Sequence, residues 1–144
     1  MIIVRPMTEE DVSKAAVLEA SCFSMPWSEQ SFLDAVRNTN TLYLAAEEDG
    51  RFVGMCGLWQ SFEEADVMNV AVEESCRGRG IAAMLMEELI RLGKERGIEA
   101  FLLEVRSSNQ PAIRLYEKCG FVTEGVRKNF YEMPREDALI MWKR

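Results

Sequence analysis

The sequence contains no histidine. A Ser-His-Asp triad, a Cys-His dyad and a histidine-ligated metal site are therefore excluded. Any general base must be a carboxylate, an amine, a tyrosine or a water molecule. The cysteines include no C-x-x-C pair of the kind that structural zinc sites use, so we expect reduced, mostly buried thiols and no metal. These cysteines are Cys22, Cys56, Cys76 and Cys119.

Positive charge and long apolar runs are also scarce. The 17 basic residues are outnumbered by 24 acidic ones, which gives a net charge of −7. That balance disfavours a nucleic acid partner and favours a basic protein or peptide. No apolar run approaches the length of about 18 residues that a membrane span needs, and the N-terminus turns acidic at Glu9. We therefore expect a cytoplasmic protein that does not bind membranes and is a monomer or a weak oligomer.

Length and composition are typical of a globular chain. Hydrophobic residues make up 48% of the 144 residues and charged residues 28%, so neither disorder nor a disulfide scaffold is needed to explain the sequence. We see no repeat, low-complexity stretch or linker. The sequence predicts a single domain over residues 1–144.

Periodicity, caps and turn residues predict alternating strands and helices. Strands are expected at 2–5, 41–47, 52–60, 67–72, 100–105, 121–127 and 138–142, and helices at about 8–22, 28–36, 81–97 and 109–120. The connections between 41 and 72 are too short for a crossover helix and predict antiparallel pairing. The helix between 67–72 and 100–105 makes those two strands a parallel pair. The expected fold class is α/β (α+β), with one mixed central sheet and helices on both faces.

A glycine-containing loop leads from the strand 67–72 into the strongest predicted helix. In Arg77-Gly78-Arg79-Gly80-Ile81-Ala82-Ala83, the glycines permit close approach of an anion, and the helix N-terminus and the two arginines supply positive charge. The loop predicts a pyrophosphate site. A simple glycine turn before a helix is the alternative without a ligand.

The same residues admit a dinucleotide-binding reading. Gly78-x-Gly80-x-x-Ala83 matches the nicotinamide fingerprint in its G/A form, and Glu104 follows at about the distance of a ribose-binding acid. The context disfavours a dehydrogenase, because the first glycine should follow its strand almost at once. The strands in front of the loop also lack the alternating helices of a doubly wound domain.

The loop resembles the Q/R-x-x-G-x-G/A acetyl-CoA loop of the GCN5-related N-acetyltransferase (GNAT) superfamily, and the order of elements agrees across essentially the whole chain. Within that superfamily the sequence is most similar to the bacterial ribosomal-protein alanine N-acetyltransferases, the RimI-like enzymes. The motifs that carry this similarity are Pro26–Glu29, Asn69–Val72, Leu103–Arg106, Ser108-Asn109, Leu115-Tyr116 and Arg135–Ala138.

The resemblance implies acetyl-CoA as co-substrate. In the family, backbone N–H groups of the third long strand hold the acyl carbonyl, the loop holds the pyrophosphate, and residues of the last helix contact the pantetheine arm. The implied cofactor-binding residues are Val70, Ala71, Val72, Arg77, Gly78, Arg79, Gly80, Ile81, Ala82, Ala83, Asn109 and Tyr116. Without a ligand, Asn109 reads as a helix cap.

Acetyl transfer to an amine requires a base for the ammonium proton and an acid for the departing thiolate. In the absence of histidine, Glu104 at the end of an apolar strand is the best candidate base. An ion pair with Arg106 is its structural alternative. The resemblance makes Tyr116 the acid, whereas most helix tyrosines simply pack their ring in the core.

The resemblance also implies a groove for the acceptor peptide. Its walls are Met25, Pro26 and Trp27 on one side and the segment Asn129-Phe130-Tyr131 on the other. Apolar walls suit a small first residue such as alanine, and the acidic surface suits a basic ribosomal protein or peptide. Two alternatives stay open: an acetyltransferase for a small amine such as a polyamine or aminoglycoside, and a non-catalytic acetyl-CoA sensor or subunit.

Overall fold

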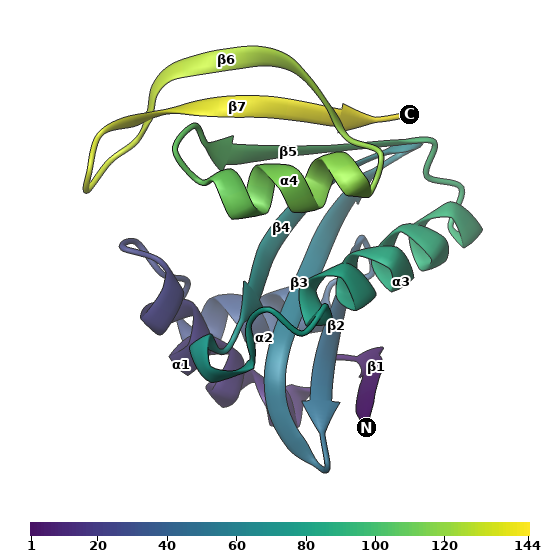
Figure 1. The fold of residues 1–144 in the computed structure, drawn as a ribbon. Helices are drawn as coiled ribbons and strands as arrows, with labels where there is room; N and C mark the ends of the chain where they lie inside the picture. Colours follow the sequence, from purple (N-terminus) through teal and green to yellow (C-terminus); the bar gives the residue numbers. More distant parts are fainter.

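The computed structural model describes residues 1–144 and contains one seven-stranded sheet with the strand order β1-β2-β3-β4-β5-β7-β6 (Figure 1). The strands are β1 Ile2–Pro6, β2 Thr41–Glu48, β3 Arg51–Ser61, β4 Glu64–Val72, β5 Ala100–Arg106, β6 Val122–Tyr131 and β7 Glu136–Lys143. Only β4 and β5 pair in parallel, and every other pair is antiparallel. The expected mixed sheet is therefore confirmed, and the doubly wound alternative is wrong.

The helices begin and end close to the predicted positions. They are η1 Glu9–Asp11, α1 Val12–Cys22, α2 Glu29–Arg37, η2 Glu74–Cys76, α3 Ile81–Glu95 and α4 Gln110–Lys118. Ser28 caps α2 by accepting a hydrogen bond from the Ser31 amide, and Asn109 caps α4 by accepting one from the Ala112 amide. Gly97 follows α3 with a φ of 86°, the left-handed conformation that ends many helices. No helix has both the length and the apolar character needed to span a membrane.

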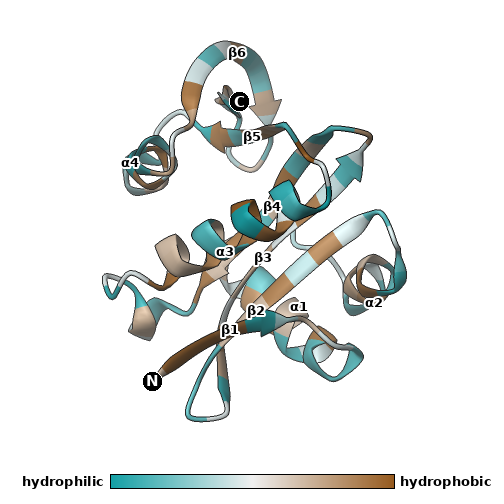
Figure 2. Cartoon of the chain, turned by 90° about the vertical axis from the view of Figure 1, so that its right-hand side faces the viewer, coloured by the Kyte–Doolittle hydropathy of each residue, from teal (hydrophilic) through white to brown (hydrophobic).

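Helices cover both faces of the sheet, as predicted, because successive side chains of a strand point to opposite faces. In β2, Tyr43 and Ala45 pack in the cluster that includes α1 and α2, while Leu44 and Ala46 pack in the cluster that includes α3. The side view in Figure 2 shows α3 on one side of β2–β4 and α1 and α2 on the other.

The central parallel pair is short. β4 and β5 are paired only at Glu64–Ala100, Ala65–Phe101 and Asp66–Leu102, although both strands continue. Figure 1 shows the two strands diverging beyond this point, with α4 lying beside the opening. This divergence divides an otherwise continuous sheet into two parts.

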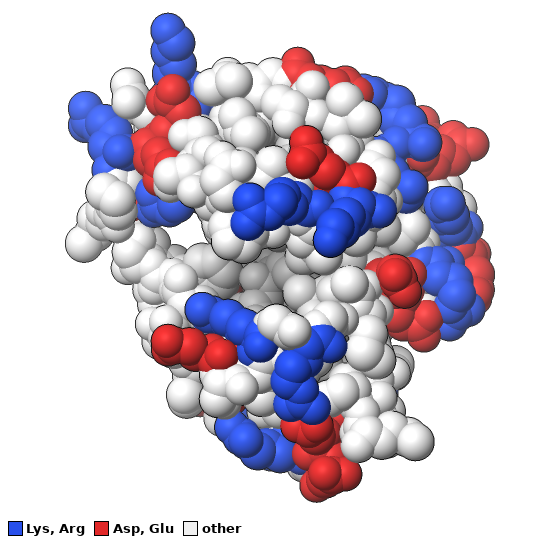
Figure 3. Space-filling model, in the orientation of Figure 1, with Lys and Arg blue, Asp and Glu red and all other residues white.

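The face in Figure 3 is hollowed between α4 and the loop that precedes α3. Lys and Arg side chains lie over both of these elements, on either side of the hollow. On this face basic groups thus flank the hollow, although the whole chain carries a net charge of −7. Such an arrangement attracts anions locally.

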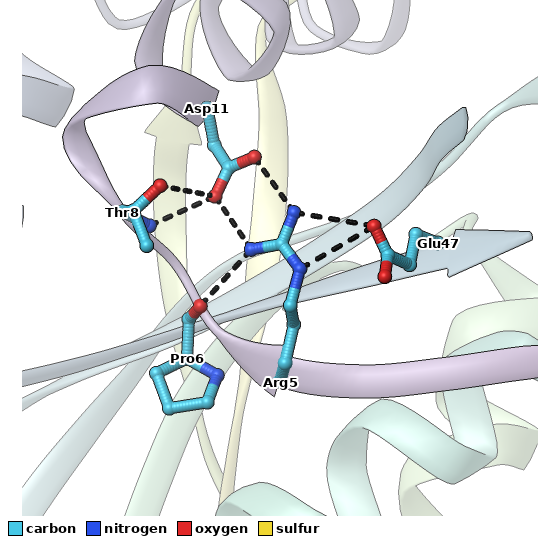
Figure 4. A network of polar contacts seen from close by, with 5 residues as sticks. All are labelled: Arg5, Pro6, Thr8, Asp11 and Glu47. Atoms are coloured by element: carbon cyan, nitrogen blue, oxygen red, sulfur yellow. Dashed lines mark hydrogen bonds and ion pairs between the residues drawn. The ribbon is translucent and has the colours of Figure 1, made fainter. Parts of the chain in front are cut away.

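A buried carboxylate joins β1, η1 and β2 (Figure 4). Asp11 is 4% exposed and accepts hydrogen bonds from both terminal nitrogens of Arg5, at 2.8 and 2.9 Å, and from the Thr8 amide at 2.8 Å. Arg5 also pairs with Glu47, at 3.4 Å. The Arg5 hydrogen bonds lower the pKa of Asp11, against the opposing effect of burial.

We expect Asp11→Asn to lower the free energy of unfolding by about 2 kcal/mol at neutral pH, because it weakens charge-assisted hydrogen bonds to a half-buried arginine. Since the folded-state pKa of Asp11 is lowered, its contribution is present above its unfolded pKa of about 3.9 and is lost as the pH falls through the folded value. Urea unfolding of both proteins from neutral pH to about pH 2 should show the difference shrinking. A difference that stays constant over this range contradicts the assignment.

Candidate functional site

A cavity of about 740 Å³ occupies the opening between β4 and β5. Its lining comes from the end of α1, the α1–α2 loop, β4, β5, α4 and the β6–β7 turn. The predicted site residues that line it are Met25, Trp27, Val70, Glu104, Asn109, Tyr116, Phe130 and Tyr131. Pro26, Ala71, Val72 and the loop residues Arg77–Ala83 lie outside this lining. The structure therefore brings the two predicted catalytic residues and most of the predicted acceptor wall into one cavity.

Glu104 is a half-buried carboxylate of β5 that has no hydrogen bond or ion pair within the chain. Its expected structural partner, Arg106, is engaged elsewhere. The Arg106 guanidinium pairs with Glu136 at 3.3 Å and donates to the Pro134 carbonyl at 2.9 Å. The interpretation of Glu104 as half of an Arg106 ion pair is therefore wrong, and its carboxylate is left available to the cavity.

Tyr116 and Asn109 project from α4 into the same cavity, as their spacing of two helical turns predicts. Tyr116 is 8% exposed, and its ring packs edge-on against Phe121 at 6.0 Å. Burial raises the pKa of Tyr116 further above its usual value, and the hydroxyl is protonated at neutral pH, as an unshifted tyrosine also is. The side-chain carbonyl oxygen of Asn109 accepts a hydrogen bond from the Ala112 amide at 3.3 Å and so caps the helix.

The strand opposite Glu104 contains a bulge. Met55 pairs with Ala71 and Gly57 with Met68, so that Asn69 and Val70 stand opposite the single residue Cys56. Asn69 accordingly adopts a φ of 57°, in the left-handed region. A bulge bends the strand and interrupts its ladder, and here it lies at the wall of the cavity.

The loop before α3 has the backbone that close anion approach requires. Gly78 and Gly80 have φ angles of 78° and 80°, and no atom lies within 4 Å of where a Cβ would be. Gly80 is the N-cap of α3, which is 15 residues long, so the helix presents unpaired N–H groups there. The two arginines, however, have partners within the chain: Arg79 pairs with Glu48, and Arg77 donates to the Val72 carbonyl at 3.1 Å.

The β6–β7 side of the cavity is fixed by Arg106. Its guanidinium lies over the Tyr131 ring, 4.4 Å from the centroid, and donates to the Glu132 carbonyl at 3.2 Å. Burial, together with the nearby negative charge of Glu104, raises the pKa of Tyr131 to about 12. Tyr131 is therefore a neutral, amphipathic wall residue close to Glu104.

The sequence interpretation missed Glu19, a carboxylate of α1 that also lines the cavity. Glu19 is 4% exposed, and burial raises its pKa despite hydrogen bonds from Asn69 and Trp27. A signal for it existed, because Glu19 shares a helix face with the apolar residues Ala15 and Cys22, at spacings of four and three residues. No group of three acidic or cysteine side chains that would hold a metal is found.

Comparisons with known proteins agree with this geometry. The family model described as Acetyltransferase (GNAT) family matches residues 12–121. A Bacillus subtilis (strain 168) protein, provisionally named a ribosomal protein bS18-alanine N-acetyltransferase, is 40% identical over 140 residues, which cover 96% of this chain and 93% of the relative. The Escherichia coli (strain K12) ribosomal protein bS18-alanine N-acetyltransferase is 32% identical over 145 residues, covering 98% and 96%.

Solved structures show the same relationship. The crystal structure of the ribosomal-protein-S18-alanine N-acetyltransferase from Escherichia coli superposes with a TM-score of 0.91 at 31% identity, covering 99% of this chain and 93% of that one. Ard1 from Thermoplasma volcanium superposes with a TM-score of 0.90 at 26% identity, covering 99% and 96%. This chain therefore belongs to the GNAT family of acetyl-CoA-dependent acetyltransferases and is an acyltransferase.

Proposed function

We propose that this protein transfers an acetyl group from acetyl-CoA to the N-terminal α-amine of a protein that begins with alanine, such as a small-subunit ribosomal protein. The observation that carries the proposal is the pairing, in one cavity, of an unpartnered carboxylate, Glu104, with a buried and protonated hydroxyl, Tyr116. The relatives named as ribosomal protein alanine N-acetyltransferases support the choice of acceptor. Residues 1–144 act as one catalytic domain in this proposal.

The residues present fit acetyl-CoA. The open glycine positions 78 and 80 at the N-terminus of α3 leave room for a pyrophosphate to approach backbone N–H groups. Arg79 would exchange the Glu48 carboxylate for a phosphate, and Arg77 lies in the same loop. Backbone N–H groups at Val70–Val72 would hold the acyl carbonyl, and Asn109 would contact the pantetheine arm. When bound, acetyl-CoA supplies a thioester whose carbonyl carbon accepts the amine.

Proton transfer is divided between the two residues, which line the same cavity. Glu104 takes the proton of the incoming ammonium ion, which frees the nitrogen lone pair to form the new C–N bond. As the C–S bond breaks, Tyr116 donates its proton to the sulfur. Burial raises the pKa of Tyr116, which makes its hydroxyl a weaker acid and opposes the transfer. The same desolvation raises the proton affinity of a thiolate formed in the cavity, and this second effect favours it. After the attack the nitrogen carries one proton more than the amide product, and this proton passes to the Tyr116 phenolate. Glu104 releases its proton to solvent, which restores both residues.

The acceptor enters between the α1–α2 loop and the β6–β7 turn in this proposal. Met25 and Trp27 line one side of the cavity and Tyr131 lines the other. Pro26 does not face the cavity and would act only by fixing the loop backbone. The walls suit a small first side chain, and the net charge of −7 favours a basic segment behind it.

We expect Glu104→Gln to lower kcat for an alanine-starting peptide by roughly 10² or more, because the amide cannot take the ammonium proton. The dissociation constant for acetyl-CoA should stay within about twofold of the original, since Glu104 has no hydrogen bond or ion pair that holds the fold. Free thiol release and calorimetry measure the two quantities. Glu99→Gln, an exposed carboxylate at the other end of β5, is the matched control. Equal losses of binding and turnover would refute the role of base.

We expect Tyr116→Phe to slow turnover by about 10² with little change in the KM of either substrate, because only the proton donor is removed. The phenylalanine keeps the ring contact with Phe121, so the melting temperature should change little. Thiol release at saturating substrates provides the measurement. An unchanged kcat would mean that water or another group protonates the sulfur.

A further inference from the structure

Glu19 is a buried carboxylate without a cation. It is 4% exposed, and its hydrogen bonds come only from neutral groups. Burying a charge in this way costs free energy unless the contacts it makes compensate. The proposed reaction does not use this residue, although its side chain lines the cavity. Its contacts therefore indicate what it does.

Those contacts join two walls of the cavity. One Glu19 oxygen accepts the backbone N–H of Trp27 at 3.2 Å, in the α1–α2 loop. Both oxygens accept from the Asn69 amide at 3.2 Å, at the bulge of β4. Asn69 is 50 residues from Glu19 in the sequence. A single carboxylate thus holds the acceptor-side loop against the strand that faces the acyl group in the proposed complex.

The Asn69 end of this link is itself fixed. The Tyr43 hydroxyl donates to the Asn69 carbonyl oxygen at 2.6 Å, which leaves the amide N–H₂ for Glu19. The Tyr43 ring fits in place because residue 57 is glycine: a Cβ there would lie 2.2 Å from the ring. Tyr43 also packs beside the Trp27 indole, with ring centroids 6.0 Å apart, and Phe32 packs on the same indole at 5.2 Å.

We propose that Glu19 is a positioning residue for the acceptor: its carboxylate holds the Trp27 wall in register with the β4 bulge, and so sets the space for the first residue of the acceptor peptide. The inference rests on the proposed function, because it assigns Trp27 to the acceptor wall. It predicts that loss of Glu19 acts through Trp27, on the peptide rather than on acetyl-CoA.

A double-mutant cycle tests this coupling. We expect Glu19→Ala to lower kcat/KM for an alanine-starting peptide on the order of tenfold, the effect of losing hydrogen bonds to a charged group. The KM for acetyl-CoA should stay within about twofold, as expected when only peptide contacts change. Glu19→Ala combined with Trp27→Ala should be no worse than Trp27→Ala alone, since contacting residues that act as a unit are not additive. Glu63→Ala, an exposed carboxylate in the β3–β4 turn, is the control.

Glu19→Gln separates the hydrogen bonds from the buried charge. Its carbonyl oxygen still accepts from Trp27, so kcat/KM for the peptide should lie closer to the original protein than to Glu19→Ala. If Glu19→Ala does not fold, the same cycle is run with Asn69→Gly, which removes the β4 end of the link and tolerates the left-handed backbone there. Losses at Glu19 and Trp27 that multiply independently, or an equal rise in both KM values, would overturn the proposal.

Hydrogen exchange distinguishes failure of this inference from failure of the proposed function. Glu19→Ala should accelerate amide exchange at residues 23–28 by roughly tenfold or more, because the Trp27 N–H loses its acceptor. This holds whether or not peptides are substrates. Unchanged exchange would overturn the positioning role, whereas faster exchange in a protein that acetylates no peptide would overturn only the assignment of the acceptor.

Discussion

The short pairing of β4 with β5 is the constraint on which the rest of the structure depends. Three residue pairs join the two strands. Beyond them β4 remains paired with β3, and β5 with β7, but the edges of β4 and β5 that face each other are unpaired. Neither helix layer closes the gap, so a cavity opens in the middle of a sheet that is otherwise continuous. Side chains from both halves of the chain therefore line one cavity, where the unpaired edges of β4 and β5 form no hydrogen bonds with each other.

Charge is distributed around this opening so that the carboxylate of β5 stays free. Arg106, two residues beyond Glu104 on the same strand, is held by Glu136 and by carbonyl groups of the β6–β7 turn. Glu136 also accepts from the Ser108 amide at 2.7 Å, which ties the start of α4 to β7. The same contacts that order the Tyr131 wall thus remove the cation that would otherwise neutralise Glu104.

Burial raises the pKa of three other ionisable groups at the cavity. It raises the pKa of Glu19 and also that of Tyr116 and Tyr131, two hydroxyls that are protonated at neutral pH even without a shift. The cavity thus contains proton donors and an unpaired carboxylate within one desolvated space. Such a combination suits a reaction that moves one proton onto the protein and another off it.

Local signals explain why much of the fold was predictable. Ser28, Asn109 and Gly97 mark helix ends through contacts or φ angles within a few residues, and the short connections between β2, β3 and β4 require antiparallel pairing. Helix geometry alone predicts that Asn109 and Tyr116, seven residues apart, lie on the same side of the helix. These features do not depend on distant residues.

What the sequence did not reveal depends on contacts between distant segments. The pairing of Arg79 with Glu48 links a loop to a strand end 31 residues away, and the Glu19–Asn69 link spans 50 residues. The helical spacing places Glu19 on the apolar face of α1, but only the packing of α1 against β4 shows that its carboxylate contacts Asn69. The family resemblance indicated Glu104 and Tyr116, the proposed catalytic pair, but contained no information on Glu19 and Asn69, which hold the proposed acceptor wall.

The most direct test of the central claim is acetyl-CoA turnover by the purified protein against peptides that differ only in their first residues, with mass spectrometry locating the acetyl group. The account predicts selective labelling of the α-amine of peptides that begin with alanine, strongest when basic residues follow. Turnover with polyamines or aminoglycosides but with no peptide, or tight acetyl-CoA binding without any turnover, would contradict it.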